Sequence, residues 1–413
     1  MNIRKLFCIV ALGATGVTAE TQGQEFRTDV NPALRYYEAF IVGRELAPAD
    51  KDYLLTNEWR GQTLPERVGT LLASYNNAFQ FVRRAGQATV PCDWGIDLSD
   101  GAETLLPHLA RCRALAQIGQ VRVLWDLQTG REAEGSEDLI GLFALARNSS
   151  QDGTLIGCLV QFAMEGLVLG SVEANYGRFS PATLQRLAEG FDAAPRAGTC
   201  AEAMLKGEKA LFSDWLKRKI FEFRQEYPGD EGKVMAKVTA LFADMKDESG
   251  KNPWMDAITG LKTSEGVLQA AHDSELLVDR AAQVMALPYA AFGEAAKQFQ
   301  TDVAASGNAL AILGMPAILK ARAKEFRAQA KFAMFHAAVA YKLHGQEGLQ
   351  ACADPFGQGP FAFERFFFQG VDRGFKLTSA LMQDGQREAL IFVESDGPGF
   401  FTENARLGQP LSK

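Results

Sequence analysis

Apolar residues recur at the three- and four-residue spacing of an α-helix over most of this chain, from Asn31 to about His344. The clearest stripe runs through Leu64, Val68, Leu71, Leu72, Tyr75, Phe79 and Val82. A stripe of this kind places its side chains on one face of a helix, where they can be buried together. The sequence therefore predicts a mainly α fold over most of its length.

Cap and turn signals divide this pattern into separate helices. Asn31-Pro32 and Ser180-Pro181 each pair an N-cap residue with proline at the first helical position. Glycine turns between 105 and 163 predict stacked antiparallel hairpins, with packing similar to that of tetratricopeptide proteins. Besides the helices that begin at 32 and 64, helices are expected at about 103–129, 136–147, 154–176, 181–191, 200–223, 233–245, 264–287, 289–305 and 316–343. We expect an antiparallel helical array.

The pattern changes at Gly345. The runs 361–369, 375–382 and 389–395 are short, rich in aromatic and β-branched residues, and separated by Gly/Asp turns, which predicts a small antiparallel β-meander. Side chains of a strand point alternately to its two faces, and the phenylalanines at 361, 363, 366 and 368 occupy positions of both kinds. This indicates a bulge or a sheet covered on both faces. We expect a helical domain over 26–345, either undivided or divided near 228–252, and a C-terminal module over 346–413.

The first nineteen residues have the pattern of a secretion signal. Arg4 and Lys5 precede the apolar run 6–12, and Val17-Thr18-Ala19 has the small residues of a cleavage site. A membrane anchor or a core helix is the alternative, but the apolar stretch is shorter than the roughly 20 residues that a span needs, and no later run is long enough. We expect cleavage after Ala19, a periplasmic or extracellular location, and no transmembrane segment in the mature chain.

The charge of the chain bears on its partners. Removal of residues 1–19 leaves 41 basic against 50 acidic residues, so the formal net charge changes from -7 to -9. This acidity argues against nucleic acid or an anionic membrane as the main partner. The mature chain has an odd number of cysteines without a CxxC motif, so a disulfide framework is not indicated, although one or two bridges are compatible with export. These cysteines are Cys92, Cys112, Cys158, Cys200 and Cys352.

Three segments follow one another in the C-terminal part of the chain, namely the helix end 337–345, the turn Asp354-Pro355-Phe356, and the run 390–399. In this order they resemble the C-terminal region of the major pseudopilins of type II secretion. The resemblance implies a long helix that leads through a loop into a small sheet. In that family an acidic segment at the end binds calcium, but here it is reduced to Asp396, and a hard cation requires several carboxylates. No calcium site is expected.

Three further segments, 31–37, 91–95 and 106–109, lie in the first two thirds of the chain. With them this part of the chain is similar to a group of uncharacterised exported bacterial helical proteins. Many members of the group end in the same pseudopilin-like tail. The resemblance implies fold and location, and it implies no activity.

Motifs for metal binding and nucleophilic catalysis are sparse. Four histidines are present, and His336 and His344 lie eight residues apart, whereas two ligands on one helix need a spacing of three or four. His272 and Glu275 have helical spacing, yet a di-iron bundle needs two such pairs and two further carboxylates. No P-loop, Gly-x-Ser-x-Gly or HExxH motif occurs. The sequence therefore indicates no metal and no cofactor.

One loop stands out as a candidate site. In 91–101 the carboxylates of Asp93, Asp97 and Asp100 surround Trp94, and the following helix carries His108. A tryptophan platform beside carboxylates is typical of a sugar-binding or glycosidase cleft. The alternative is structural, because acidic residues before a helix interact with its dipole, and a tryptophan in such a loop commonly anchors packing.

Three functions remain open on the sequence. The leading hypothesis is an exported, non-enzymatic protein-interaction or scaffold module of the cell envelope, since helical arrays commonly offer grooves to other proteins. The second is a hydrolase of glycans or peptides that uses the carboxylates near Trp94. The third is a protein that binds a small apolar ligand between its helices.

Overall fold

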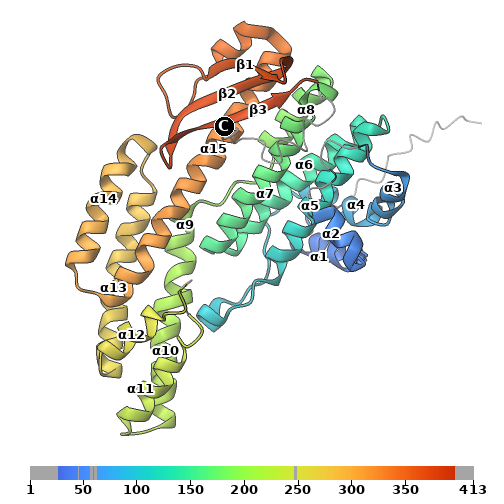
Figure 1. The fold of residues 1–413 in the computed structure, drawn as a ribbon. Helices are drawn as coiled ribbons and strands as arrows, with labels where there is room; N and C mark the ends of the chain where they lie inside the picture. Colours follow the sequence, from blue (N-terminus) through green and yellow to red (C-terminus); the bar gives the residue numbers. More distant parts are fainter. Residues whose placement is uncertain (1–26, 45, 56–58, 60–62, 246–248, 396–413) are drawn as a thin grey trace, which may run out of the picture.

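The computed structural model describes residues 27–44, 46–55, 59, 63–245 and 249–395. Helices form most of this part of the chain, and a three-stranded antiparallel sheet follows them (Figure 1). This confirms the predicted mainly α fold with a small C-terminal β-meander. The expected signal peptide, 1–19, and Asp396 lie outside the described residues.

The first group of helices forms antiparallel hairpins. Asn31 caps the first helix by accepting a hydrogen bond from the amide of Ala33, as the cap signal predicts. The predicted stripe 64–82 is divided between two helices, because the chain turns at Ser74 and Tyr75. The helices are α1 Pro32–Val42, α2 Pro48–Leu55, α3 Glu66–Ala73, α4 Asn76–Gly86, α5 Pro107–Gln128, α6 Glu132–Ser149, α7 Leu155–Ala174 and α8 Pro181–Asp192.

The second group extends away from the first as an elongated arm (Figure 1). It begins with α9 Cys200–Ala203, which continues through the π-helical segment Met204–Asp214 into α10 Trp215–Glu226. The other members are α11 Glu231–Ala240, α12 Pro253–Gly260, α13 Ser264–Met285 and α14 Tyr289–Ala305. The long helix α15, Ala309–Ala351, starts seven residues earlier than expected because Asn308 caps it, and it runs from this arm back to the first group.

The sheet consists of β1 Ala362–Phe368, β2 Val371–Gln383 and β3 Gln386–Val393 in the order β1-β2-β3. Gln369-Gly370 and Asp384-Gly385 link the strands with positive φ angles at both residues, the conformation of tight hairpin turns. The register shifts between Phe366 and Phe367, which agrees with a bulge, the first of the two alternatives that the sequence left open.

Most of the buried apolar side chains of the described residues lie in three large hydrophobic clusters, and a small fourth one lies around Phe368 and Val393. The largest contains the first group of helices, the C-terminal half of α15 and the sheet. Phe375 and Phe392 of the sheet contact the ring of Tyr176, with centroids 5.3 and 5.4 Å apart. A second cluster joins α7, α9 and α13 to α15, and the third lies around Trp215 and Phe242 in the arm.

Only α7 among the helices of the described residues is long and apolar enough to cross a membrane. In the structure 61% of its most apolar window is buried in protein, as in a core helix. The described part of the chain therefore has no clear transmembrane segment.

Candidate functional site

Trp94 lies in the core of the first group of helices. The residue is 4% exposed, and its indole nitrogen donates a hydrogen bond to the backbone oxygen of Asn148 at 2.7 Å. Its ring stacks on Tyr36 and on His108, with centroids 5.6 and 4.5 Å apart. The side chain acts as a packing anchor, and its faces are covered by protein.

His108 is buried beside Trp94 at the start of α5. Its Nε2 lies 3.2 Å from Oδ2 of Asp152, which is also buried, although the angle is not that of a hydrogen bond. The other oxygen of Asp152 accepts from the amide of Thr154, the N-cap residue of α7. The pair thus joins the starts of α5 and α7 inside the protein.

The three carboxylates of the same loop are exposed. Asp93 accepts a hydrogen bond from the amide of Gly95 at 2.9 Å, and Asp97 accepts one from the amide of Ser99 at 2.8 Å. The hydrogen bonds from Ser99 lower the pKa of Asp97. Asp100 lies in the short 3₁₀ helix that follows. The structure therefore brings Trp94 and His108 together in the core and leaves the carboxylates at the surface of the loop, where they shape local turns.

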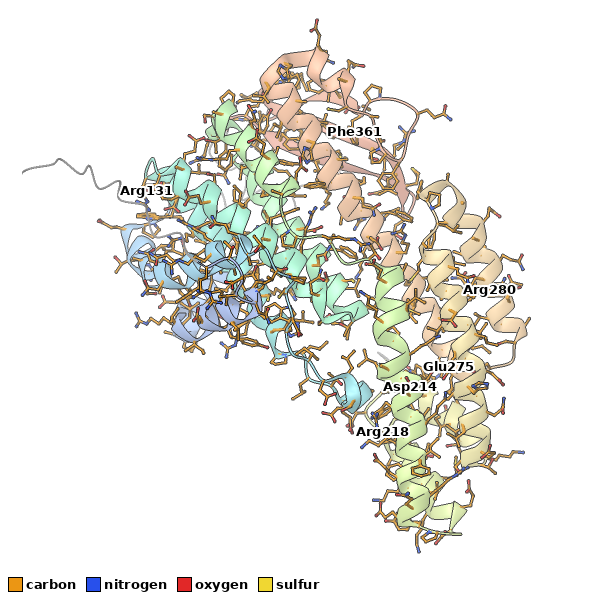
Figure 2. All side chains as sticks on the ribbon, turned by 180° about the vertical axis from the view of Figure 1, so that it is seen from behind. Arg131, Asp214, Arg218, Glu275, Arg280 and Phe361 are labelled. Atoms are coloured by element: carbon orange, nitrogen blue, oxygen red, sulfur yellow. The ribbon has the colours of Figure 1, made fainter. Side chains whose placement is uncertain are left out.

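The end of this loop reaches the arm. Gly101 has a positive φ of 59° and lies directly against Trp215, since a Cβ atom there would be 1.9 Å from the Cγ atom of the indole. Arg218 of α10 donates a hydrogen bond to the backbone oxygen of Ser99, and Figure 2 shows Arg218 at the tip of the loop. The loop is a strap that ties the first group of helices to the arm.

A polar cleft lies between α3, α4, α5 and α6, away from the predicted site. Its volume is about 580 Å³. The wall combines three arginines, three acidic residues and a tryptophan with small and neutral side chains. The lining residues are Glu66, Gly69, Thr70, Leu72, Ala73, Asn76, Gln80, Arg83, Arg122, Trp125, Asp126, Arg131 and Glu134.

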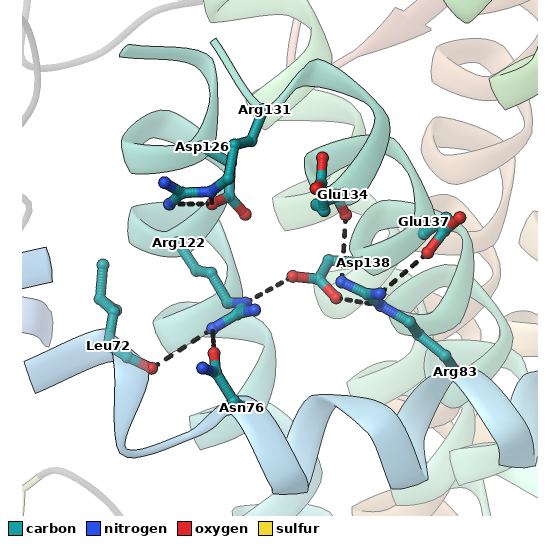
Figure 3. A network of polar contacts seen from close by, with 9 residues as sticks. All are labelled: Leu72, Asn76, Arg83, Arg122, Asp126, Arg131, Glu134, Glu137 and Asp138. Carbon is teal, nitrogen blue, oxygen red and sulfur yellow. Dashed lines mark hydrogen bonds and ion pairs between the residues drawn. The ribbon is translucent and has the colours of Figure 1, made fainter. Parts of the chain in front are cut away.

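Two of the arginines are held by one buried carboxylate, Asp138 (Figure 3). Its two oxygens accept hydrogen bonds from Nε of Arg83 and Nε of Arg122, each at 2.6 Å. Arg83 also reaches Glu137 at 2.8 Å, and Arg122 donates to the side chain of Asn76 at 2.6 Å. Burial by itself would lower the pKa of Arg83. The contacts of Arg83 with Asp138 and Glu137 outweigh the effect of burial, so the pKa of Arg83 is raised above its ordinary value. The network fixes the position of both guanidinium groups.

The third arginine, Arg131, pairs with Asp126 at the end of α5. Thr129 ends the helix, and Gly130 turns the chain back with a φ of 75°. This turn lets Arg131 donate two hydrogen bonds to one oxygen of Asp126, at 2.6 and 3.0 Å. The other oxygen of Asp126 is buried and has no hydrogen-bond partner. Burial raises the pKa of this carboxyl despite the nearby arginines.

Trp125 contributes the aromatic part of the wall. Its ring packs directly on the backbone of α3, because a Cβ atom at Gly69 would lie 2.2 Å from the Cζ2 atom of the indole. The residue is only partly buried, so part of it remains open to the cleft. Glycine at position 69 is therefore needed for the wall.

Sequence reasoning missed this cleft, since its residues carry no motif. They come from four helices, and each arginine and acid has the usual pattern of a helix surface. The one local signal is Trp125 beside Asp126, followed by Arg131 after a glycine turn. Within the described ranges, no group of three or more histidine, cysteine, aspartate or glutamate side chains is placed to hold a metal ion.

The chain was compared with protein-family models, with curated proteins and with solved structures, and none of them matches.

Proposed function

We propose that this protein is an exported, non-enzymatic binding module of the cell envelope, and that the cleft between α3, α4, α5 and α6 takes a segment of another protein. The observation that carries this proposal is the combination of Trp125 and three arginines around one cleft of about 580 Å³. Tryptophan is among the residues that most often dominate the binding energy of protein interfaces, and charged groups held in fixed positions around it determine which partner fits.

The rigidity of the cleft supports a role in binding. Asp138 is 0% exposed and holds Arg83 and Arg122 together, so their side chains are ordered before any partner arrives. A side chain that is already fixed loses little entropy on binding, and less of the interaction energy is therefore spent on ordering it. The backbone contact between Gly69 and Trp125 fixes the tryptophan in the same way.

The proposed location rests on the signal-like pattern of residues 1–19. A protein partner in the envelope also agrees with the acidic net charge of the chain, which disfavours nucleic acid. The small sheet packs into the largest core cluster, so its buried face is occupied by the protein itself.

The test is capture of partners from the envelope fraction of the native host. The mature protein, tagged at its C-terminus, is compared with two cleft variants, Trp125→Ala and Thr70→Trp. The first removes the aromatic wall, and the second fills the cleft from an exposed position on α3 without removing any core contact. Leu276→Ala, at a residue of α13 that is 74% exposed, is the matched control.

We expect a stoichiometric protein that is retained by the wild type and the control and lost from both cleft variants. Circular dichroism checks that the variants are folded. A partner retained equally by the wild type and by Thr70→Trp would refute the role of the cleft, and recovery of no partner would refute the interaction function.

A further inference from the structure

We propose that the segment bound in this cleft is basic. Its lysine or arginine side chain lies against Trp125, Asp126 and the acidic rim, which consists of Glu66 and Glu134. This inference rests on the function proposed above and names the chemistry of the partner.

The first argument is the charge around the cleft. Its lining and their ion-pair partners contain five carboxylates and three guanidinium groups, which leaves a net charge of -2. All three arginines are engaged, since Arg83 and Arg122 share Asp138 and Arg131 holds Asp126. An anionic ligand would have to compete with these carboxylates, whereas a cation meets charge that is not yet neutralised.

The second argument is the rim. Glu66 of α3 and Glu134 of α6 both line the cleft and are exposed, and neither side chain forms an ion pair among the described residues. Trp125 belongs to the same wall. Carboxylates beside an aromatic ring provide both the charge and the π surface that attract an ammonium or guanidinium group.

The third argument is the unpaired oxygen of Asp126. The side chain of Asp126 is 3% exposed, it belongs to the cleft wall, and its Oδ2 atom has no donor. A buried acceptor without a partner is unfavourable, so a donor that reaches this point, directly or through a water molecule, relieves that cost. Lysine and arginine carry only donors at their charged ends, which makes them suitable for this position.

The test uses fluorescein-labelled nonapeptides in which glycine alternates with lysine, glutamate or leucine, and follows binding by fluorescence anisotropy. The wild type is compared with the double variant Glu66→Gln/Glu134→Gln and with Asp126→Asn, which keeps the shape of the side chain. The matched control is Glu294→Gln/Glu347→Gln, which makes the same change in net charge at exposed positions of α14 and α15.

We expect the lysine peptide to bind best, with an affinity that falls as salt is added. The rim variant is expected to weaken it about tenfold and Asp126→Asn severalfold, while the control behaves like the wild type. Equal binding of the glutamate or leucine peptide, no binding of the lysine peptide, or equal effects of the rim and control variants would overturn the inference.

The two proposals can fail separately. If Thr70→Trp abolishes capture of the native partner but Glu66→Gln/Glu134→Gln leaves that capture unchanged, the cleft binds a protein whose segment is not basic. The inference is then refuted and the proposed function stands. If Thr70→Trp leaves capture of the native partner unchanged, the proposed function fails whatever the peptides show.

Discussion

Replacement of Glu165 by glutamine is expected to reduce the pH dependence of stability between about pH 4.5 and 7. Glu165 lies on α7, is 6% exposed, and faces Arg147 at 3.4 Å and Gln161 at 3.3 Å. The negative charge of Glu325 on α15 also raises the pKa of Glu165. Burial raises the pKa of Glu165 from 4.5 to about 7, although Arg147 opposes this shift.

The direction of the pH effect follows from the pKa of Glu165 in the unfolded chain, 4.5, and in the folded protein, about 7. Because the folded protein binds the carboxyl proton of Glu165 more tightly than the unfolded chain does, the contribution of Glu165 to stability is greatest below pH 4.5. It decreases as the pH rises, and the loss is complete once the pH exceeds the folded-state value of about 7. The difference between the two values corresponds to about 3 kcal/mol in the free energy of unfolding.

The assay is urea denaturation followed by circular dichroism at pH 4 and pH 8. Glutamine cannot ionise, so Glu165→Gln should gain about 3 kcal/mol relative to the wild type between these two pH values. Comparison of the two pH values cancels any constant effect of exchanging a carboxyl for an amide. Glu294→Gln on α14, 88% exposed in its side chain, is the control and should show no such gain. A difference between Glu165→Gln and wild type that is the same at both pH values would refute the reasoning.

Two further substitutions and a thiol titration test the packing. Gly101→Ala should lower stability by about 1–3 kcal/mol in thermal unfolding, because its Cβ atom would overlap Trp215; an unchanged melting temperature would show that the strap is not packed as described. Trp94→Ala should cost about 3–5 kcal/mol, as expected for a core aromatic side chain, and a loss of less than 1 kcal/mol would contradict its role as an anchor. In thiol titration of the native mature protein, only the partly exposed Cys352 should react quickly, and the four buried cysteines should react after denaturation. Fewer than five thiols in the denatured, unreduced protein would reveal a disulfide bridge.

The helices were predictable where their boundaries are encoded locally. The range 289–305 agrees with α14, and 181–191 ends one residue before α8 does, because caps and periodicity act over a few residues. Predictions were less accurate where packing decides the backbone. The expected helix 200–223 contains the π-helical segment Met204–Asp214, and α2 and α12 were not expected at all. Short helices of eight residues depend on tertiary contacts more than on their own propensity.

Unlike the helix boundaries, the arrangement of the candidate site could not be predicted from residues that are close in the sequence. The sequence grouped Asp93, Trp94, Asp97, Asp100 and His108 because they are close along the chain. In the structure Trp94 and His108 are buried together, while the carboxylates stay at the surface. Closeness in sequence does not determine which side of a loop faces the core, since that depends on the helices that cover it.

By itself, the sequence of this protein determined the class of the fold, the position of most helices, the order of the strands and the acidic net charge. These properties follow from spacing, capping residues and turn dipeptides, all of which act between near neighbours. Only the tertiary structure decided that Asp138 joins Arg83 to Arg122, and that Trp125 lies on Gly69. Those contacts join different helices, and the cleft exists because four helices pack side by side.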